Sequence, residues 1–181
     1  MVLVFLANGF EEIEALTPVD CLRRCGVEVK TVGVGGKVIT GSHGIKVFAD
    51  VEDSEINLDG SLEMIILPGG KAGTQNLEAS EAVSRAIDHC AENSVPIAAI
   101  CAAPSILGHK GLLKGKKAVC YPGFEGELEG AEVLGDVPAV TDGNIITGCG
   151  MGAALEFSCE IIKKLISEER AAQLLKSVNK K

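Results

Sequence analysis

The sequence has no tryptophan, one tyrosine and five phenylalanines, and its formal net charge is −8 at pH 7. A nucleic-acid surface needs a basic patch and stacking rings, and anionic membranes attract positive charge. We therefore expect neither nucleic acid nor membrane as a partner. No apolar run approaches the ~20 residues of a membrane-spanning helix. The apolar residues 1–7 lack the positive flank and cleavage site of a signal peptide, so a cytoplasmic location is expected.

Cysteine spacing excludes two further classes of protein. The seven cysteines include no C-x-x-C pair, and their number is odd, so neither a zinc ribbon nor a disulfide framework is indicated. A chain of 181 residues buries enough apolar surface to fold without a disulfide or a structural metal. We expect one domain over residues 1–181, with most cysteines in its core. No metal site and no organic cofactor are expected.

Short apolar strands alternate with helical segments along the chain. This order predicts an α/β fold with a mostly parallel sheet and helices on both faces. Residues 38–40 and 45–49 alternate around a Gly-Ser-His-Gly turn and predict a small hairpin at the sheet edge. The other expected strands are 2–7, 27–34, 62–67, 97–100, 117–121, 131–134, 139–140 and 144–147.

Helix signals divide the rest of the chain. One helix is expected from Glu11 to about Gly26, kinked at Pro18, although a start after Thr17 is the alternative. Ser80 is expected to cap the helix that follows the strand at 62–67. Further helices are expected at 104–109, at 153–166 with a buried stripe, and after Ser167. That stripe comprises Leu155, Cys159, Ile162 and Ile166.

The stretch from Ile97 to Ser105 runs from a buried strand into a helix. Pro104 suits the first helical position, which leaves Cys101 in the turn. The N–H groups of a helix start stabilise a thiolate by up to about 2 kcal/mol, or about 1.5 pK units. That effect alone would lower the pKa of a thiol from about 8.5 to about 7. Cys101 is therefore the candidate nucleophile, and it needs a further partner to ionise fully.

Histidine is the usual partner of a reactive cysteine, but none of the three is well placed. His109 lies about 12 Å along the same helix, His89 is expected to be solvated, and His43 is in the hairpin turn. The acidic run after the first strand offers a carboxyl group instead. We expect Glu11 and Glu12 to be solvated in a helix's first turn and Glu14 to be half-buried, with a raised pKa.

Two glycine-rich loops complete the candidate site. The backbone N–H groups of Gly69 or Gly70, together with that of Ala102, are placed to form an oxyanion hole. The loop that contains Cys149 and Gly150 lies between a strand and a helix, but its spacing is not that of a dinucleotide-binding loop. We expect it to line the Cys101 pocket, together with Tyr121.

Three motifs together resemble the ThiJ/PfpI superfamily, in the branch of the Parkinsonism-associated protein deglycase (DJ-one-like). They are Gly9-Phe10-Glu11-Glu12-Ile13-Glu14, Leu67-Pro68-Gly69-Gly70 and Ala98-Ala99-Ile100-Cys101-Ala102-Ala103-Pro104. The resemblance implies a flavodoxin-like three-layer sandwich in one domain of the class I glutamine amidotransferase type, and a homodimer. It also implies a nucleophile elbow at Cys101, a buried protonated glutamate at Glu14, and oxyanion-hole glycines at Gly69 and Gly70.

Members of this superfamily are described as glyoxalases, deglycases, oxidation sensors and chaperones. The resemblance therefore implies a cofactor-free enzyme acting on 2-oxoaldehydes such as methylglyoxal, or on their protein adducts. The alternative is a stress-response sensor or chaperone whose cysteine is oxidised to a sulfinate. Two residues depart from the family pattern: Tyr121 stands where the animal branch has a histidine, and Ala102 stands where the peptidase branch has one. A Cys-His peptidase is accordingly not expected.

Overall fold

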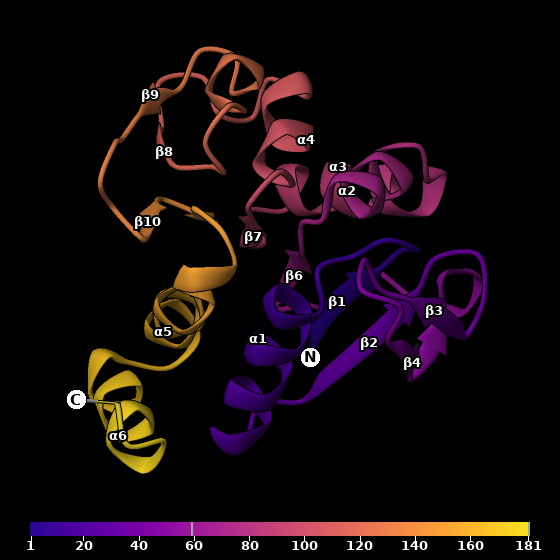
Figure 1. The fold of residues 1–181 in the computed structure, drawn as a ribbon, viewed down its shortest axis with the longest axis horizontal. Coiled ribbons are helices and arrows are strands. Elements are labelled where there is room, and N and C mark those ends of the chain that lie inside the picture. Colours follow the sequence, from indigo (N-terminus) through magenta and orange to yellow (C-terminus); the bar gives the residue numbers. More distant parts are fainter. Residues whose placement is uncertain (59, 181) are drawn as a thin grey trace.

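The computed structural model describes residues 1–58 and 60–180, and it is organised around a twisted seven-stranded sheet (Figure 1). The order across this sheet is β10-β11-β7-β6-β1-β2-β5. All neighbouring strands run parallel except β10, which is antiparallel to β11. The strands are β1 (Val2–Leu6), β2 (Val29–Gly33), β5 (Val51–Glu52), β6 (Met64–Leu67), β7 (Ile97–Ile100), β10 (Ala139–Asp142) and β11 (Ile145–Gly148).

Helices cover both faces of the sheet, as the alternation of strands and helices predicts. Along β1, Leu3 and Phe5 face one apolar core, whereas Val2, Val4 and Leu6 face the other. The first core contains residues of α2 (Lys71–Glu78), α3 (Glu81–Glu92) and α4 (Pro104–His109). The second contains residues of α1 (Glu12–Arg24), α5 (Ala154–Leu165) and α6 (Glu168–Ser177). The strand order and the three layers are those of a flavodoxin-like fold.

Two small sheets lie outside the central one. The predicted hairpin is present as β3 (Val38–Thr40) and β4 (Lys46–Phe48), which pair only with each other in the described residues. The strand predicted at 117–121 is reduced to β8 (Lys117–Ala118), which pairs in parallel with β9 (Glu132–Val133). It ends early because the next N–H groups bond elsewhere: Val119 donates to the hydroxyl of Thr147, and Tyr121 donates to the carbonyl of Cys101.

The helix predictions are confirmed in most places. α1 is a single helix that contains Pro18, so the alternative start after Thr17 is wrong. Ser80 caps α3 by accepting a hydrogen bond from the N–H of Val83, and Ser167 caps α6 in the same way through Arg170. The helix α2 was not predicted, because it has only one large apolar side chain that is buried, Leu77. Short 3-10 helices cover Asp53–Glu55, Glu125–Glu127 and Met151–Ala153.

The predicted stripe on α5 is only half correct. Cys159 and Ile162 are buried, but Leu155 is half-exposed and Ile166 is 45% exposed. Two other side chains of α5 are fully buried instead, those of Phe157 and Ile161. They are buried because the sheet, α1 and α6 all contact α5. A helix covered from several sides buries a wider arc than a single stripe.

The residues described by the structure include no helix that is long and apolar enough to cross a membrane.

Ile162 and Ile166 provide a matched test of this helix, since both are isoleucines of the predicted stripe. Ile162→Ala removes a fully buried side chain and is expected to lower the free energy of unfolding by about 2–5 kcal/mol. Ile166→Ala truncates a 45% exposed side chain and is expected to cost less than about 1 kcal/mol. Urea unfolding at equilibrium measures both, and equal losses in the two variants would show that α5 is packed differently.

Candidate active site

The candidate site lies where parallel strands of the central sheet end. Cys101 follows β7, Gly69 and Gly70 follow β6, and Cys149 follows β11. Neighbouring parallel strands bring their carboxyl ends to one edge, where an α/β sheet has its binding crevice. The strand β6 lies between β1 and β7 in the sheet. Glu14 of α1 therefore reaches Cys101 past the backbone of Gly69.

Cys101 is held in a backbone conformation that few non-glycine residues adopt. Its φ is +67°, in the left-handed region, as the resemblance to a nucleophile-elbow family implies. Two hydrogen bonds hold the corner in this conformation: the N–H of Cys101 donates to the carbonyl of Gly148 at 2.9 Å, and its carbonyl accepts from the N–H of Tyr121 at 2.8 Å. Such conformations cost about 1–3 kcal/mol and persist where neighbours fix them. The side chain of Cys101 is half-buried.

Glu14 is more deeply buried than expected, with 1% of the residue exposed. Its Oε2 accepts a hydrogen bond from the N–H of Gly69 at 3.0 Å. A Cβ built on Gly69 would lie 2.6 Å from Oε2 of Glu14 and 2.6 Å from Cβ of Cys101. No side chain fits between the carboxyl and the cysteine, so glycine at position 69 allows these two groups to approach each other.

Glu14 and Cys101 form an interacting pair of acids. Burial raises the pKa of Glu14 to about 7, and hydrogen bonds with Cys101 and with the backbone of Gly69 and Met151 limit the rise. Burial also raises the pKa of the Cys101 thiol, to about 12, and the charge of an ionised Glu14 contributes to this. The prediction that a helix start brings this thiol to about 7 is wrong, since burial and the carboxylate outweigh the backbone N–H groups.

Because burial raises the pKa of Glu14 to about 7 and raises that of the Cys101 thiol well above it, the pair holds a single proton above neutral pH. With the proton on sulfur, Glu14 is a carboxylate. With the proton on Glu14, Cys101 is a thiolate that accepts a hydrogen bond from the carboxyl, and the repulsion between the two charges is removed. Nucleophilic thiolate is therefore available in this range through a protonated Glu14.

The backbone N–H groups around the sulfur differ from the predicted set in one member. Hydrogen bonds from the backbone of Gly70 and Ala102 lower the pKa of Cys101, which places these two N–H groups against the sulfur. The N–H of Gly69 donates to Glu14 instead and is not free for an oxyanion. Gly70 has φ +86°, and a Cβ there would lie 2.4 Å from the carbonyl oxygen of Gly9, so this corner also requires glycine.

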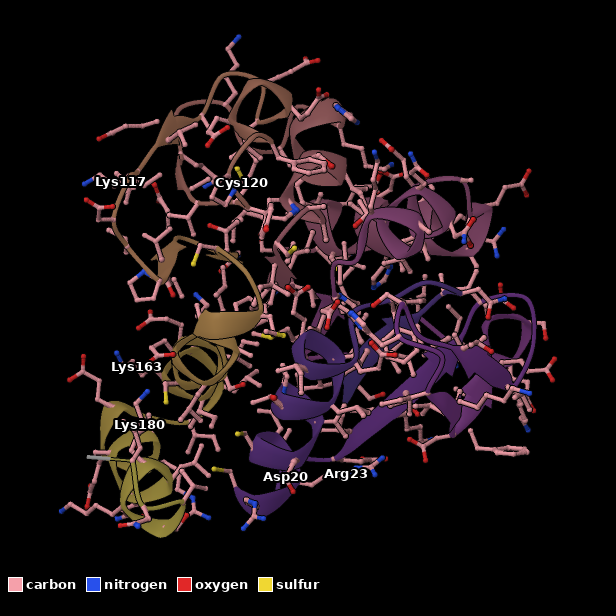
Figure 2. All side chains as sticks on the ribbon, viewed as in Figure 1. Asp20, Arg23, Lys117, Cys120, Lys163 and Lys180 are labelled. Carbon is pink, nitrogen blue, oxygen red and sulfur yellow. The ribbon has the colours of Figure 1, made fainter. Side chains whose placement is uncertain are left out.

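Two of the three predicted pocket residues, Tyr121 and Gly150, lie next to each other in the structure. The ring of Tyr121 lies over Gly150, because a Cβ built on Gly150 would be 3.2 Å from Cδ2 of that ring. Cys149 lines a cavity of about 690 Å³ together with Cys120, and burial and the charge of Glu14 both raise the pKa of its thiol. In Figure 2, Cys120 is labelled on the upper segment of the chain, far from Asp20 and Arg23 on α1.

The histidines have carboxylate partners or lie on the surface, and the structure records no interaction of any of them with Cys101. His109 contacts Glu78 through Nδ1 at 2.6 Å and Glu127 through Nε2 at 2.8 Å. Hydrogen bonds with these carboxylates raise the pKa of His109. His89 is half-buried in the last turn of α3, beside Asn93. The geometry therefore agrees with the expectation that none of the histidines is the partner of the Cys101 thiol.

Glu12 overturns the expectation of a solvated first turn. Only 4% of it is exposed, because the turn of the β3–β4 hairpin folds over it. Burial by itself raises its pKa, but hydrogen bonds from its own N–H, the backbone and ring of His43 and the backbone of Ile45 outweigh this and lower the pKa to about 2. Gly41 provides the space, since a Cβ there would lie 2.3 Å from Oε1 of Glu12.

Sequence reasoning also missed Met151, whose backbone donates a hydrogen bond that lowers the pKa of Glu14. The residue starts the 3-10 helix that precedes α5 and is 52% exposed. The sequence feature that could have identified Met151 is the Gly-Cys-Gly-Met-Gly loop, in which only Cys149 and Gly150 were predicted to line the pocket.

Comparisons with known proteins agree with this architecture. The sequence model of the DJ-1/PfpI family matches residues 1–164. The chain is 33% identical to the protein dj-1beta of Drosophila melanogaster, over 97% of this chain and 95% of that protein. It is also 33% identical to a deglycase of Pyrococcus abyssi, over 91% of this chain and 98% of that protein. The chain spans only 40% and 45% of the Arabidopsis thaliana DJ-1 homologues B and A.

Solved structures show the same arrangement of elements. The crystal structure of Drosophila melanogaster DJ-1beta superposes with a TM-score of 0.93 at 31% sequence identity, covering 98% of this chain and 96% of that one. The structure of oxidized Toxoplasma gondii DJ-1 gives a TM-score of 0.92 at 32% identity, covering 98% and 97% of the two chains.

The raised pKa of Glu14 predicts a pH-dependent stability. Below its ordinary value of 4.5 the carboxyl is protonated in both the folded and the unfolded chain, and burying it carries no ionisation penalty. Between 4.5 and about 7 the unfolded chain ionises first, so the folded state loses about 3 kcal/mol of relative stability. Glu14→Gln removes this loss and keeps an oxygen that accepts from the N–H of Gly69.

Urea unfolding of wild type and Glu14→Gln between pH 4 and pH 8 measures the difference. The free energy of unfolding of the variant is expected to gain on that of wild type as pH rises through this window. Parallel profiles would contradict the raised pKa.

Proposed function

Because the chain belongs to the DJ-1/PfpI family, we propose that it is a cysteine-dependent enzyme without a cofactor, acting on methylglyoxal-like 2-oxoaldehydes or their protein adducts. The observation that carries the proposal is the buried carboxyl of Glu14 next to the thiol of Cys101. A pair that shares one proton supplies both a nucleophile and an acid–base group. The similarity to a protein named a deglycase supports the same chemistry.

The first step is addition of the Cys101 thiolate to the aldehyde carbon. The new carbon–sulfur bond turns the carbonyl oxygen into an oxyanion, which the N–H groups of Gly70 and Ala102 stabilise by hydrogen bonds. These are the same N–H groups that face the sulfur in the free protein. The protonated Glu14 then gives its proton to the oxyanion, which leaves a hemithioacetal and a Glu14 carboxylate.

The second step moves a hydrogen between adjacent carbons. The Glu14 carboxylate removes the proton from the carbon that bears sulfur, and the electron pair moves toward the neighbouring ketone, whose oxygen becomes the anion of an enediolate. Glu14 returns its proton to that neighbouring carbon, and the hydroxyl proton moves from the oxygen beside sulfur to the other oxygen, which gives a thioester of a 2-hydroxy acid. Water then hydrolyses the thioester, which releases lactate from methylglyoxal and restores the Cys101 thiol. Atoms and electrons balance with water as the only co-substrate.

The same first step suits an adduct of a 2-oxoaldehyde on a protein amine or thiol. Such an adduct is in equilibrium with the free aldehyde, so consumption of the aldehyde by the Cys101–Glu14 pair also removes the adduct. Activity on the free aldehyde is therefore the simplest measurement of the proposed chemistry.

Lactate production from methylglyoxal tests the enzyme directly. Cys101→Ala lacks the nucleophile and is expected to make no lactate above the uncatalysed rate. Glu14→Gln lacks the acid–base group and is expected to lose about 10²–10⁴-fold in kcat. Cys25→Ser is the matched control, since Cys25 is half-buried at the end of α1, outside the described contacts of the pair, and is expected to retain full activity. Equal and negligible rates in wild type and all three variants would refute the proposed enzyme.

A second candidate function is a redox sensor or stress-response chaperone in which Cys101 is oxidised to a sulfinate. The observation that favours it is the half-buried thiol beside a carboxyl that hydrogen-bonds to it, since the same group would donate to a sulfinate oxygen. A related structure of Toxoplasma gondii DJ-1 is described as oxidized. Here the oxidant is a peroxide, and each oxygen added to sulfur comes from one peroxide molecule.

Mass spectrometry after mild peroxide treatment tests the sensor. Cys101 is expected to gain two oxygen atoms before any other cysteine is modified, because its thiolate forms through Glu14. Glu14→Gln is expected to slow this oxidation. Preferential oxidation of Cys120 or Cys149, the two cysteines of the neighbouring cavity, would count against the sensor.

We further propose a cytoplasmic homodimer built from one domain per chain. All seven cysteines are free, which suits a reducing compartment. Large apolar side chains are exposed on α1 and on the β3–β4 hairpin, including Ile13, Ile45 and Phe48, the last of them 78% exposed. Exposed apolar surface of this kind is typical of protein interfaces.

A further inference from the structure

Two cysteines that have no role in the proposed reaction, Cys120 and Cys149, line one cavity of about 690 Å³. Residues 133–138, which join β9 to β10, form another part of its wall. The exposed residues Glu125 and Asp136 also line it, so a small oxidant enters from solvent. This part of the chain lies far from the β3–β4 hairpin (Figure 1), and access therefore does not depend on the homodimer proposed above.

The hydrogen bonds of the Cys101 corner bring the two cysteine-bearing segments together. The N–H of Cys101 donates to the carbonyl of Gly148 at 2.9 Å, and the residue after Gly148 is Cys149. The carbonyl of Cys101 accepts from the N–H of Tyr121 at 2.8 Å, and the residue before Tyr121 is Cys120. Each of the two cysteines is thus one peptide bond away from a group that contacts the same residue.

A third hydrogen bond aligns these segments on one face of the sheet. The N–H of Val119 donates to Oγ1 of Thr147 at 2.9 Å, so the residue before Cys120 lies against the residue two positions before Cys149. Side chains two positions apart along an extended chain point to the same side. Cys120 belongs to the first apolar core, whereas Cys101 packs against the second. The cavity and this alignment therefore pair Cys149 with Cys120 rather than with Cys101.

Both thiols of this pair are protonated at neutral pH. Burial raises the pKa of Cys120 to about 11, and the charges of Glu125 and of an ionised Cys149 contribute to this because both groups lie close to it. Burial raises the pKa of Cys149 as well. Their oxidation is therefore slower than that of Cys101, whose thiolate forms through Glu14.

We propose that a peroxide links Cys120 and Cys149 in a reversible disulfide beside the Cys101 corner. Cys149 is the more exposed of the two, and its sulfur attacks one peroxide oxygen. A sulfur–oxygen bond forms and the oxygen–oxygen bond breaks, which gives a sulfenic acid and one water molecule. The Cys120 sulfur then attacks the Cys149 sulfur, and the hydroxyl group leaves with the thiol proton as a second water molecule.

Two thiols and one hydrogen peroxide thus give one disulfide and two water molecules. The disulfide joins the two segments whose hydrogen bonds hold Cys101 in its left-handed conformation. It requires neither the thiol of Cys101 nor activity on an aldehyde, so it goes beyond the proposed function and is tested independently of it.

Peptide mapping by mass spectrometry without reductant tests the disulfide after prolonged treatment with hydrogen peroxide. In wild type and in Cys101→Ala, the peptides that contain Cys120 and Cys149 are expected to be linked, with the loss of two hydrogen atoms. The linked chain is expected to be a monomer in a denaturing, non-reducing gel. Dithiothreitol is expected to separate the two peptides again.

Three variants keep the test decisive. Cys120→Ser and Cys149→Ser each remove one sulfur and are expected to lose the link. Cys25→Ser changes a half-buried cysteine at the end of α1 and is expected to form the link as wild type does. Oxidised wild type without this link, a link formed only between two chains, or a disulfide between Cys101 and Cys149 in its place would overturn the proposal.

Discussion

One buried proton, shared by Glu14 and Cys101, is the constraint on which the rest of the site depends. The carboxyl is 1% exposed, and the thiol is held beside it at a strained corner. Neither group ionises easily alone, because burial raises the pKa of both. Together they lose one proton near neutral pH, and the remaining proton determines whether the site presents a thiol or a thiolate.

The glycines around the site have a common physical cause. Three chain segments, which follow β1, β6 and β7, meet at one sheet edge, and the carboxyl must approach the sulfur past the segment that follows β6. Any side chain at Gly69 would occupy the space between the two reacting groups, and any side chain at Gly70 would collide with the turn after β1. The backbone N–H groups exposed by this absence of side chains are then available to the pair and to an oxyanion.

Two carboxyls of the same acidic run have pKa values that are shifted in opposite directions. Glu14 has few donors and keeps a raised pKa, whereas Glu12, two residues earlier, is surrounded by backbone donors and has a pKa of about 2. Both are almost fully buried. Burial raises the pKa of both carboxyls; the donors directed at Glu12 reverse this rise, whereas those directed at Glu14 only limit it.

Much of the fold could be predicted from the sequence because local signals were strong. The apolar strands, the cap at Ser80 and the start of α4 at Pro104 each depend on a few neighbouring residues. The position of a residue relative to segments that are distant in the sequence could not be predicted in this way. The burial of Glu12 depends on a hairpin turn some 31 residues away, and the strand between β1 and β7 follows from sheet order alone.

The candidate site shows the same division. Cys101 and Glu14 were found from the sequence because a strand, a turn and an acidic first turn mark them. The balance of their pKa values was predicted wrongly for the thiol, because that balance depends on how deeply the packed fold buries both groups. Similarly, the cavity that Cys149 and Cys120 line together depends on the packing of two segments that are distant in the sequence, and the sequence did not predict it.

The pH dependence of Cys101 alkylation by iodoacetamide tests the shared proton most directly, because the rate follows the thiolate even where thiolate is the minor form. In wild type the rate is expected to rise with an apparent pKa of about 7, the value at which the pair loses its first proton, and then to level off. In Glu14→Gln this step is expected to disappear. A wild-type profile without a step near pH 7, or the same step in both proteins, would contradict the account.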